Sequence, residues 1–220
     1  MISFKVHWLA SSHREWLIDP RRTNLFEHYY GLKLSKTQKL SAKARIIDSL
    51  EGFYHSEAYR FLQSLPPAAF LANGVDAASF EIDGIVVQAK PACVVRTHDG
   101  IMIYDWHGGS IQDDRLLLAV YRLYGAAMWN ADPNQVQCQV VYLRTRPLAV
   151  TTEAMSPEDV HVFIRNSAGD MGVCLDDPDE NRASPGRFPM TDDRNQCERC
   201  RFKEVCSGER KADRAFPGVK

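Results

Sequence analysis

The first part of the chain has apolar residues that recur at helical spacing. Residues 11–31 and 41–65 both follow this pattern before Pro66 and Pro67 interrupt it. The pattern predicts a largely helical N-terminal part. In the second segment we expect the recurring apolar residues to belong to the core: Ile46, Ile47, Leu50, Phe53, Tyr54, Phe61 and Leu62.

After residue 68 the pattern changes to that of strands. Residues 80–88, 92–97 and 101–106 are short runs rich in β-branched and aromatic residues. Between the last two runs, residues 98–100 read His-Asp-Gly, which predicts a tight hairpin. We therefore expect at least one antiparallel pair of strands.

The remaining elements alternate helices with strands. Residues 112–129 carry an apolar helical stripe, residues 135–145 and 146–155 read as two strands, and residues 156–175 begin with a Ser-x-x-Asp capping pattern before another helix. This order predicts an α/β or α+β domain in which helices flank a mixed central sheet.

Composition and length limit the organisation of the chain. Its 220 residues, 45% of them hydrophobic, are enough for one main core and a small satellite module. Residues 176–190 are rich in Pro, Gly and Asn, as linkers are, so we expect a main domain over 1–190 and a cysteine-rich tail over 191–220 that packs on the N-terminal helices. Neither a membrane-spanning run nor a secretion signal is evident, and this favours a cytoplasmic protein without a membrane partner.

The formal net charge is only −1, but one stretch is strongly basic. Residues 28–47 contain no acidic residue and carry the cations Lys33, Lys36, Lys39, Lys43 and Arg45. Two interpretations are open: a solvated helix face, or a local surface that binds nucleic acid.

The motifs that suggest chemistry lie in VQAKPACVVRTHDGIMIYDWHGG, residues 87–109, which precede a helix with a tyrosine and a C-x2-C-x5-C tail. Together they resemble the PD-(D/E)XK nuclease superfamily, in particular the RecB-like branch that includes CRISPR-adaptation exonucleases. The resemblance covers about residues 8–210. It implies a restriction-endonuclease-like core in which two carboxylates hold Mg²⁺ or Mn²⁺ and a lysine orients the attacking water.

Several motif positions depart from the pattern of this family. Asp105 keeps the second carboxylate and Tyr121 the helix tyrosine, but Ala92 replaces the first aspartate, His107 the lysine and Leu117 the glutamine. We therefore expect a pseudoenzyme without Mg²⁺-dependent nuclease activity. Its expected role is to bind DNA, single-stranded or at ends, or to serve as a subunit with protein partners in a DNA-processing or defence complex.

Two other interpretations are open. Glu81, Asp83, Asp105 and His107 would build a rearranged active site of a metal-dependent DNase, with His107 as ligand or base, although a strand histidine is also a common structural residue. Alternatively, the chain is a protein-interaction scaffold that does not bind DNA and presents exposed aromatic residues, namely Trp8, Trp16 and Trp129.

The six cysteines fall into two groups. Three cysteines stand singly among apolar neighbours, which predicts buried free thiols: Cys93, Cys138 and Cys174. The C-x2-C-x5-C spacing of Cys197, Cys200 and Cys206 suggests a metal site instead.

The resemblance implies a [4Fe-4S] cluster at this tail, whose fourth ligand, a cysteine in the family, is replaced here by Asp19. Cys174 or His13 are alternative ligands, and zinc or metal-free thiols are alternative states. Arg199 and Arg201 of the tail would then lie near the basic run and add to a groove for DNA phosphates.

Overall fold

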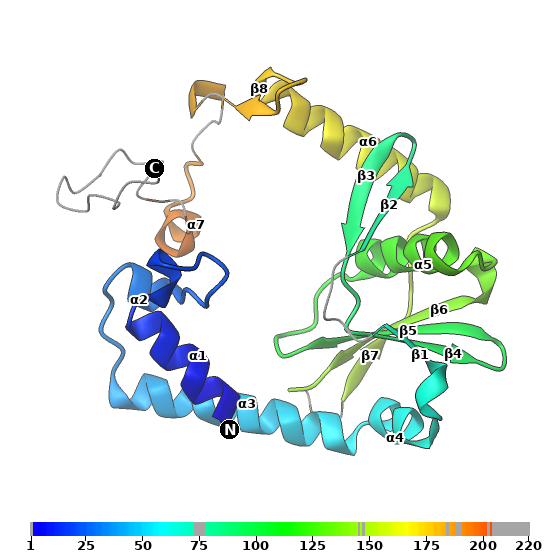
Figure 1. Cartoon of the computed structure of the whole chain (residues 1–220), viewed down its shortest axis with the longest axis horizontal. Coiled ribbons are helices and arrows are strands. Elements are labelled where there is room, and N and C mark those ends of the chain that lie inside the picture. The colour runs from blue at the N-terminus through cyan, green and yellow to red at the C-terminus, as the bar shows by residue number, and fades with distance from the viewer. Residues whose placement is uncertain are drawn as a thin grey trace. The chain divides into compact units, whose positions relative to one another are not determined.

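The computed structural model describes residues 2–72, 78–144, 146, 148–183, 185–187, 191–201 and 203. The chain divides into two compact units, of which one contains residues 1–36 and 174–220 and the other residues 37–173 (Figure 1). Within the described ranges, no helix combines the length and the apolar character that a membrane span requires.

A five-stranded mixed sheet organises the unit of residues 37–173, in the order β1-β4-β5-β6-β7. Its strands are β1 (Phe70–Ala72), β4 (Cys93–Thr97), β5 (Gly100–His107), β6 (Val136–Tyr142) and β7 (Ala149–Thr151). β4 and β5 are antiparallel, β5 and β6 are parallel, and β6 and β7 are antiparallel. The expected mixed sheet flanked by helices is confirmed, and the fold is α+β.

Helix α5 (Arg115–Trp129) makes the crossover between the two parallel strands and covers one face of the sheet (Figure 1). Alternate residues of β5, Ile101 and Ile103, pack there with Leu118, Tyr121 and Tyr124 of α5. Side chains of successive strand residues point to opposite faces, so the residues between them belong to a second core.

The second core covers the other face of the sheet. Tyr104, Met102 and Trp106 of β5 pack there with Ala58 and Leu62 of α4 (Glu57–Ser64). The sheet is therefore buried on both sides, and the end of β5 presents different chemistry to each.

The predicted helix over 41–65 forms two helices, α3 (Lys36–His55) and α4. They separate at Ser56, whose Oγ accepts a hydrogen bond from the N–H of Tyr59 at 3.0 Å, as an N-cap does. α3 approaches the sheet most closely at Gly52, where a Cβ atom would lie 2.1 Å from the carbonyl oxygen of Leu143.

Most of the apolar residues that we expected in the core on these helices are exposed. Because α3 meets the sheet along a narrow face that includes Gly52 and Phe53, large side chains of its other faces remain accessible. The prediction is wrong for these residues: Ile46, Ile47, Leu50, Tyr54 and Phe61.

Residues 80–88, predicted as one strand, form a separate hairpin of β2 (Ala78–Ile82) and β3 (Ile85–Ala89). The chain turns at Asp83 and Gly84, which have φ angles of 51° and 79°. An Asp-Gly pair favours this two-residue turn because both positions need positive φ. Asp83 accepts hydrogen bonds from Arg165 Nη1 at 2.6 Å and His161 Nδ1 at 3.0 Å, both on α6 (Pro157–Val173).

The other unit consists of short elements. They are α1 (Ile2–Ser12), α2 (Phe26–Tyr29), α7 (Arg194–Arg199) and the hairpin of β8 (Leu175–Asp177) and β9 (Arg182–Ala183). The stretch 11–31, expected to be mostly helical, is helical only in short pieces, because α1 ends before Arg14, a residue with a φ of 57°. Single 3₁₀ turns in the two units span Glu15–Leu17, Pro67–Ala69, Pro133–Gln135 and Pro185–Arg187.

Side-chain contacts join α2 to the segment after α7. The hydroxyl of Tyr30 donates to the carbonyl oxygen of Arg201 at 2.7 Å, and the ammonium of Lys203 lies 4.2 Å from the centroid of the Tyr30 ring. A cation at this distance is attracted by the ring face.

Candidate functional site

The end of β5 carries the two residues that the motif singled out. Asp105 and His107 are two positions apart on a strand, so both side chains face α5. The strand is held at this point by its neighbour β6, because the N–H of Leu143 donates to the carbonyl oxygen of His107 at 2.8 Å.

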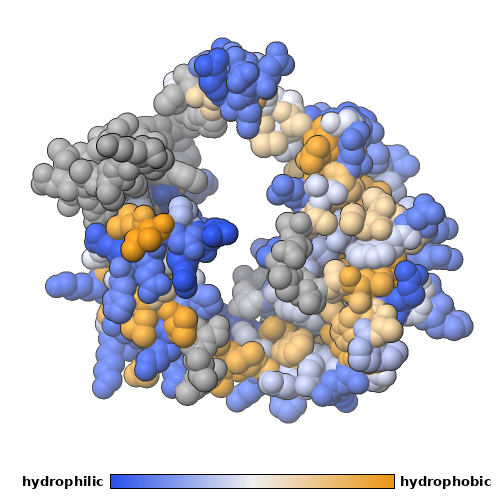
Figure 2. Space-filling model, viewed as in Figure 1, coloured by the Kyte–Doolittle hydropathy of each residue, from blue (hydrophilic) through white to orange (hydrophobic). Residues whose placement is uncertain are grey.

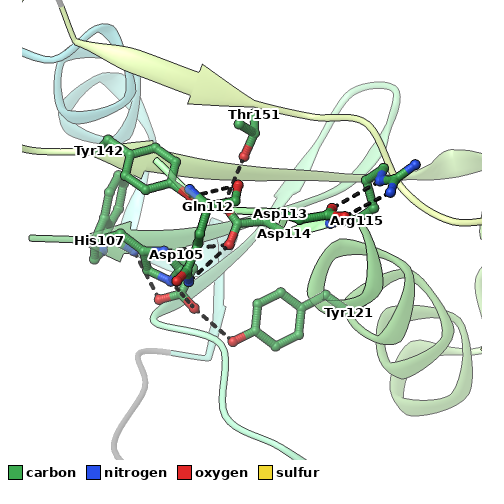
Figure 3. A network of polar contacts seen from close by, with 10 residues as sticks. Asp105, His107, Gln112, Asp113, Asp114, Arg115, Tyr121, Tyr142 and Thr151 are labelled. Carbon is green, nitrogen blue, oxygen red and sulfur yellow. Dashed lines mark hydrogen bonds and ion pairs between the residues drawn. The ribbon is translucent and has the colours of Figure 1, made fainter. Parts of the chain in front are cut away.

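Both carboxylate oxygens of Asp105 accept hydrogen bonds (Figure 3). Oδ2 accepts from the hydroxyl of Tyr121 at 2.9 Å, and Oδ1 accepts from the N–H of Trp106 at 2.9 Å. Burial, reinforced by the neighbouring carboxylate of Asp105, raises the pKa of Tyr121 far above its ordinary value. The phenol therefore remains a proton donor to Asp105 at any physiological pH.

His107 lies between two carboxylates (Figure 3). Its Nε2 is 3.9 Å from Oδ2 of Asp105, and its Nδ1 is 3.6 Å from Oδ1 of Asp114. Both distances exceed a hydrogen bond, so the imidazole is a close neighbour of both carboxylates but is hydrogen-bonded to neither. The ring also meets Tyr142 edge-on, with the centroids 5.4 Å apart.

Asp114 is the most buried acid of the site, with 2% of its side chain exposed. Its carboxylate accepts hydrogen bonds from the hydroxyl of Tyr142, from Oγ1 of Thr151 at 3.2 Å and from Nε2 of Gln112 at 3.3 Å. A buried carboxylate needs such donors, because desolvation without them is costly. Burial is also the main reason that the pKa of Tyr142 is raised.

Asp114, Tyr142 and Thr151 were not among the predicted site residues. Asp114 occupies the position before α5, and its backbone carbonyl accepts the N–H of Leu118 at 2.9 Å. An aspartate directly before an apolar helical run is a recognised start signal for a helix, so the sequence contained a sign of its location. No sequence pattern indicates its proximity to His107.

Ala92, at the expected first aspartate, lies directly before β4. The antiparallel register pairs Cys93 with Tyr104 and Val94 with Ile103. Ala92 and Asp105 each adjoin this Cys93–Tyr104 pair, so the two positions lie at the same end of the hairpin. Ala92 itself supplies no metal ligand.

The two other acids of the rearranged-site hypothesis lie on the separate hairpin. Glu81 is on β2 and exposed, and Asp83 is in the β2–β3 turn, bound to α6. Among the contacts of the described residues, none joins either acid to Asp105 or His107. Leu117, at the position where the family has a glutamine, packs against the core between α5 and the sheet.

The predicted nucleic-acid-binding residues are divided between the two units. Lys39, Lys43 and Arg45 are exposed on α3 in the sheet unit, whereas Lys36 and Arg201 belong to the other unit. The backbone of Arg199 ends α7, but its side chain is outside the described part.

The aromatic residues expected to be exposed have partners instead. The ring of Trp8 meets that of His28 edge-on with the centroids 4.6 Å apart. The ring centroids of Trp16 and Tyr29 are 5.3 Å apart, and Trp129 meets Tyr124 edge-on with the centroids 5.5 Å apart. All three tryptophans are partly buried, which corrects the expectation of freely presented rings.

The cysteines divide as the sequence suggested only in part. Cys93 and Cys138 are buried free thiols, as predicted, and burial raises the pKa of Cys138 to about 12. Cys174 is only partly buried, which corrects the prediction for this residue. Cys197 and Cys200 are also partly buried, whereas Cys206 lies outside the described residues.

The described residues do not assemble a metal site at the tail. Nowhere in the described ranges do three or more His, Cys, Asp or Glu side chains come together in a group suited to a metal ion. The carboxylate of Asp19 accepts the N–H of Arg21 at 3.1 Å and contacts Nε of Arg22 at 3.8 Å. Iron–sulfur or zinc ligation by Asp19 and the three cysteines stays a prediction.

Comparisons with known proteins do not extend this description: no family model, curated protein or solved structure matches the chain. The chemistry of the site therefore has to be argued from its residues. They form a series, Tyr121–Asp105–His107–Asp114–Tyr142, in which a partly exposed imidazole separates two hydrogen-bonded carboxylates.

Proposed function

We propose that the chain is a catalytically degenerate PD-(D/E)XK nuclease-family protein. Its role is to bind nucleic acid, single-stranded or at ends, as a subunit of a larger DNA-processing or defence assembly. The observation that supports this most is that Ala92 directly precedes β4 and Asp105 directly follows its last paired residue on β5, so both positions adjoin the Cys93–Tyr104 pair at the same end of the hairpin. This is where the family needs its two metal-binding carboxylates, and one of them is missing.

The order of elements also supports the proposal. The hairpin of β4 and β5 leads to Asp105 and His107, α5 follows with a tyrosine that reaches Asp105, and β6 returns parallel to β5. The family places its Asp/Glu-x-Lys motif and its helix tyrosine in this order.

The state of the remaining groups argues against magnesium chemistry. The carboxylate of Asp105 is engaged by Tyr121 and by a backbone N–H, and that of Asp114 by three donors. Mg²⁺ gives up its water ligands reluctantly and requires well-placed oxygens, so one engaged carboxylate beside Ala92 does not fit it. His107 lacks the permanent charge of the lysine that it replaces.

The test is cleavage of a labelled single-stranded oligonucleotide by the unmodified chain, Ala92→Asp, His107→Lys and the double variant, with Mg²⁺ and with Mn²⁺. Both positions adjoin the Cys93–Tyr104 pair at the end of the hairpin, so we expect the new carboxylate to share a cation with Asp105. We expect cleavage only from variants that contain Ala92→Asp, with the largest rate from the double variant.

Cleavage by the unmodified chain, lost in Asp105→Asn, would instead favour the rearranged active site. One observation supports that candidate: His107 lies between Asp105 and the buried Asp114. A double variant that binds DNA and retains the fold but does not cleave would remove the support for the nuclease relationship.

A further inference from the structure

A groove of about 670 Å³ lies between α3 and the end of β5, within the sheet unit. Trp106 and Phe53 form its aromatic part, and Ile46 and Leu50 of α3 extend its apolar lining. Its volume is in the range of roughly 300–1,000 Å³ that small-molecule sites occupy. Trp106 belongs to the core opposite α5, so the groove is on the other face of the sheet from Asp105 and His107.

The aromatic part of the groove is held in place by ring contacts. The rings of Phe53 and Trp106 meet edge-on with centroids 5.1 Å apart, and Trp106 stacks on Tyr104 at 5.4 Å with an interplanar angle of 7°. A stacked pair with an edge contact restricts the rotation of the indole. The groove therefore offers fixed ring surface, which a flat apolar ligand can contact with little loss of side-chain entropy.

Two guanidinium groups complete the lining. Arg45 comes from α3, and Arg144 follows β6 and donates through Nη1 to the carbonyl oxygen of Gly108 at 3.3 Å. None of the described lining residues is an aspartate or glutamate. The groove thus combines apolar ring surface with positive charge only, although the chain as a whole has a net charge of −1.

Apolar side chains reach the surface in both units (Figure 2). In the groove, Ile46 and Leu50 are 39% and 51% exposed. A ligand that suits this groove needs flat apolar rings and negative charges at a short spacing. Single-stranded nucleic acid has both, because its bases are free to leave the stack while its phosphates bind arginine. A duplex keeps its bases paired inside.

We propose that this groove binds single-stranded nucleic acid, with a base against Phe53 and Trp106 and phosphates at Arg45 and Arg144. The proposal rests on the proposed function and deepens it, since it assigns strand binding to the face of the sheet opposite the degenerate motif. Loss of the chemistry at Ala92 and His107 leaves this face intact.

The chain offers a matched pair of variants for the test. Ile46 and Ile47 are neighbours on α3 and equally exposed, at 39% each, but only Ile46 lines the groove. Binding of a fluorescent oligothymidylate of about 12 nucleotides would be measured by anisotropy with the full chain. Ile46→Gln should raise Kd about threefold or more, because it replaces apolar lining of the groove with a polar amide. Ile47→Gln should leave Kd nearly unchanged.

A second measurement isolates the arginines. The slope of log Kd against log salt changes by about 0.7 for each lost phosphate contact on a single strand. Arg45→Gln combined with Arg144→Gln should therefore reduce this slope by about 1.4. Arg60→Gln removes an equal charge from α4, outside the groove, and serves as the control.

Each outcome decides the proposal. If the oligonucleotide binds but Ile46→Gln and Ile47→Gln weaken it equally, the groove is not the site, and the proposed function still stands. If the unmodified chain binds an acidic peptide in the groove and no oligonucleotide, the groove proposal fails together with the binding role. Cleavage by the double variant with Ala92→Asp and His107→Lys would then still support the nuclease relationship alone.

Discussion

Gly52 of α3 provides the sharpest test of how the groove is built. A Cβ atom at this position would lie 2.1 Å from the carbonyl oxygen of Leu143 and 3.0 Å from its carbonyl carbon. Real Cβ contacts below 3.0 Å essentially do not occur. In Gly52→Ala the helix and the end of β6 must therefore separate by about 1 Å, because a backbone carbonyl cannot rotate away as a side chain can.

Two effects of this substitution oppose each other. Alanine is favoured over glycine in a helix interior by about 1 kcal/mol. Overpacking of a tight contact costs about 1–3 kcal/mol, and contact with backbone favours the upper end of that range. We expect the clash to win and Gly52→Ala to lower the free energy of unfolding by about 2 kcal/mol.

Urea unfolding followed by far-UV circular dichroism measures this difference. With a slope of about 2 kcal/mol per molar urea, the midpoint should fall by about 1 M. Gly169→Ala on α6 is the control, since a Cβ there would have no atom within 4 Å. Its midpoint should rise by up to about 0.5 M. Equal stabilisation by both substitutions would refute the close approach of α3 to the sheet.

Three further predictions concern the site and the thiols. Tyr121→Phe removes a hydroxyl that donates to a carboxylate and should lower the free energy of unfolding by about 1 kcal/mol in the same urea assay. At pH 8, Ellman's reagent should modify Cys138, buried and with its pKa raised to about 12, at least about tenfold more slowly than the partly buried Cys197. The side-chain hydrogen bond from Arg115, reinforced by its backbone N–H, lowers the pKa of Asp113 from 3.8 to about 2. A carboxyl whose pKa is lowered by folding stabilises the folded state above pH 3.8, and this stabilisation is lost as the pH falls through about 2. In Arg115→Gln, the pKa of Asp113 measured by NMR titration should rise toward 3.8.

Local signals in the sequence predicted the sheet well where they were applied consistently. The His98-Asp99-Gly100 run predicted the β4–β5 hairpin, and the Asp83-Gly84 pair marks the turn that the prediction of a single strand overlooked. At Asp83 and Gly84 both turn residues have positive φ, as this dipeptide favours.

Helical spacing was a weaker guide to burial. It identifies residues that share a face of α3, but it does not reveal what covers that face. Gly52, the residue of closest approach, carries no hydrophobic signal at all, while Ile46 and Leu50 remain exposed. Which face packs is decided by contact with the distant Leu143, and this information is absent from the local pattern.

The candidate site shows the same division between local and distant information. That Asp105 and His107 share a face follows from strand alternation alone. The family resemblance assigned Asp105 and Tyr121 to one motif, but it did not predict their hydrogen bond. The approach of Asp114 to His107 likewise requires the return of the chain between β5 and α5. Connections of this kind are determined by packing and not by periodicity.

Successive side chains of β5 point to opposite faces of the sheet, so the candidate catalytic residues and the proposed binding groove lie on opposite faces. Asp105 and His107 face α5, and Trp106 faces the groove, so a substitution on one face changes few contacts on the other. The faces are coupled where β6 ends, since Leu143 binds the carbonyl of His107 and Arg144 that of Gly108. A strand bound in the groove would therefore act on the site mainly through these two hydrogen bonds, one from the backbone of Leu143 and one from the side chain of Arg144. Under the proposed function, such an arrangement would let the fold lose its metal-binding carboxylate at Ala92 while the proposed binding groove is retained.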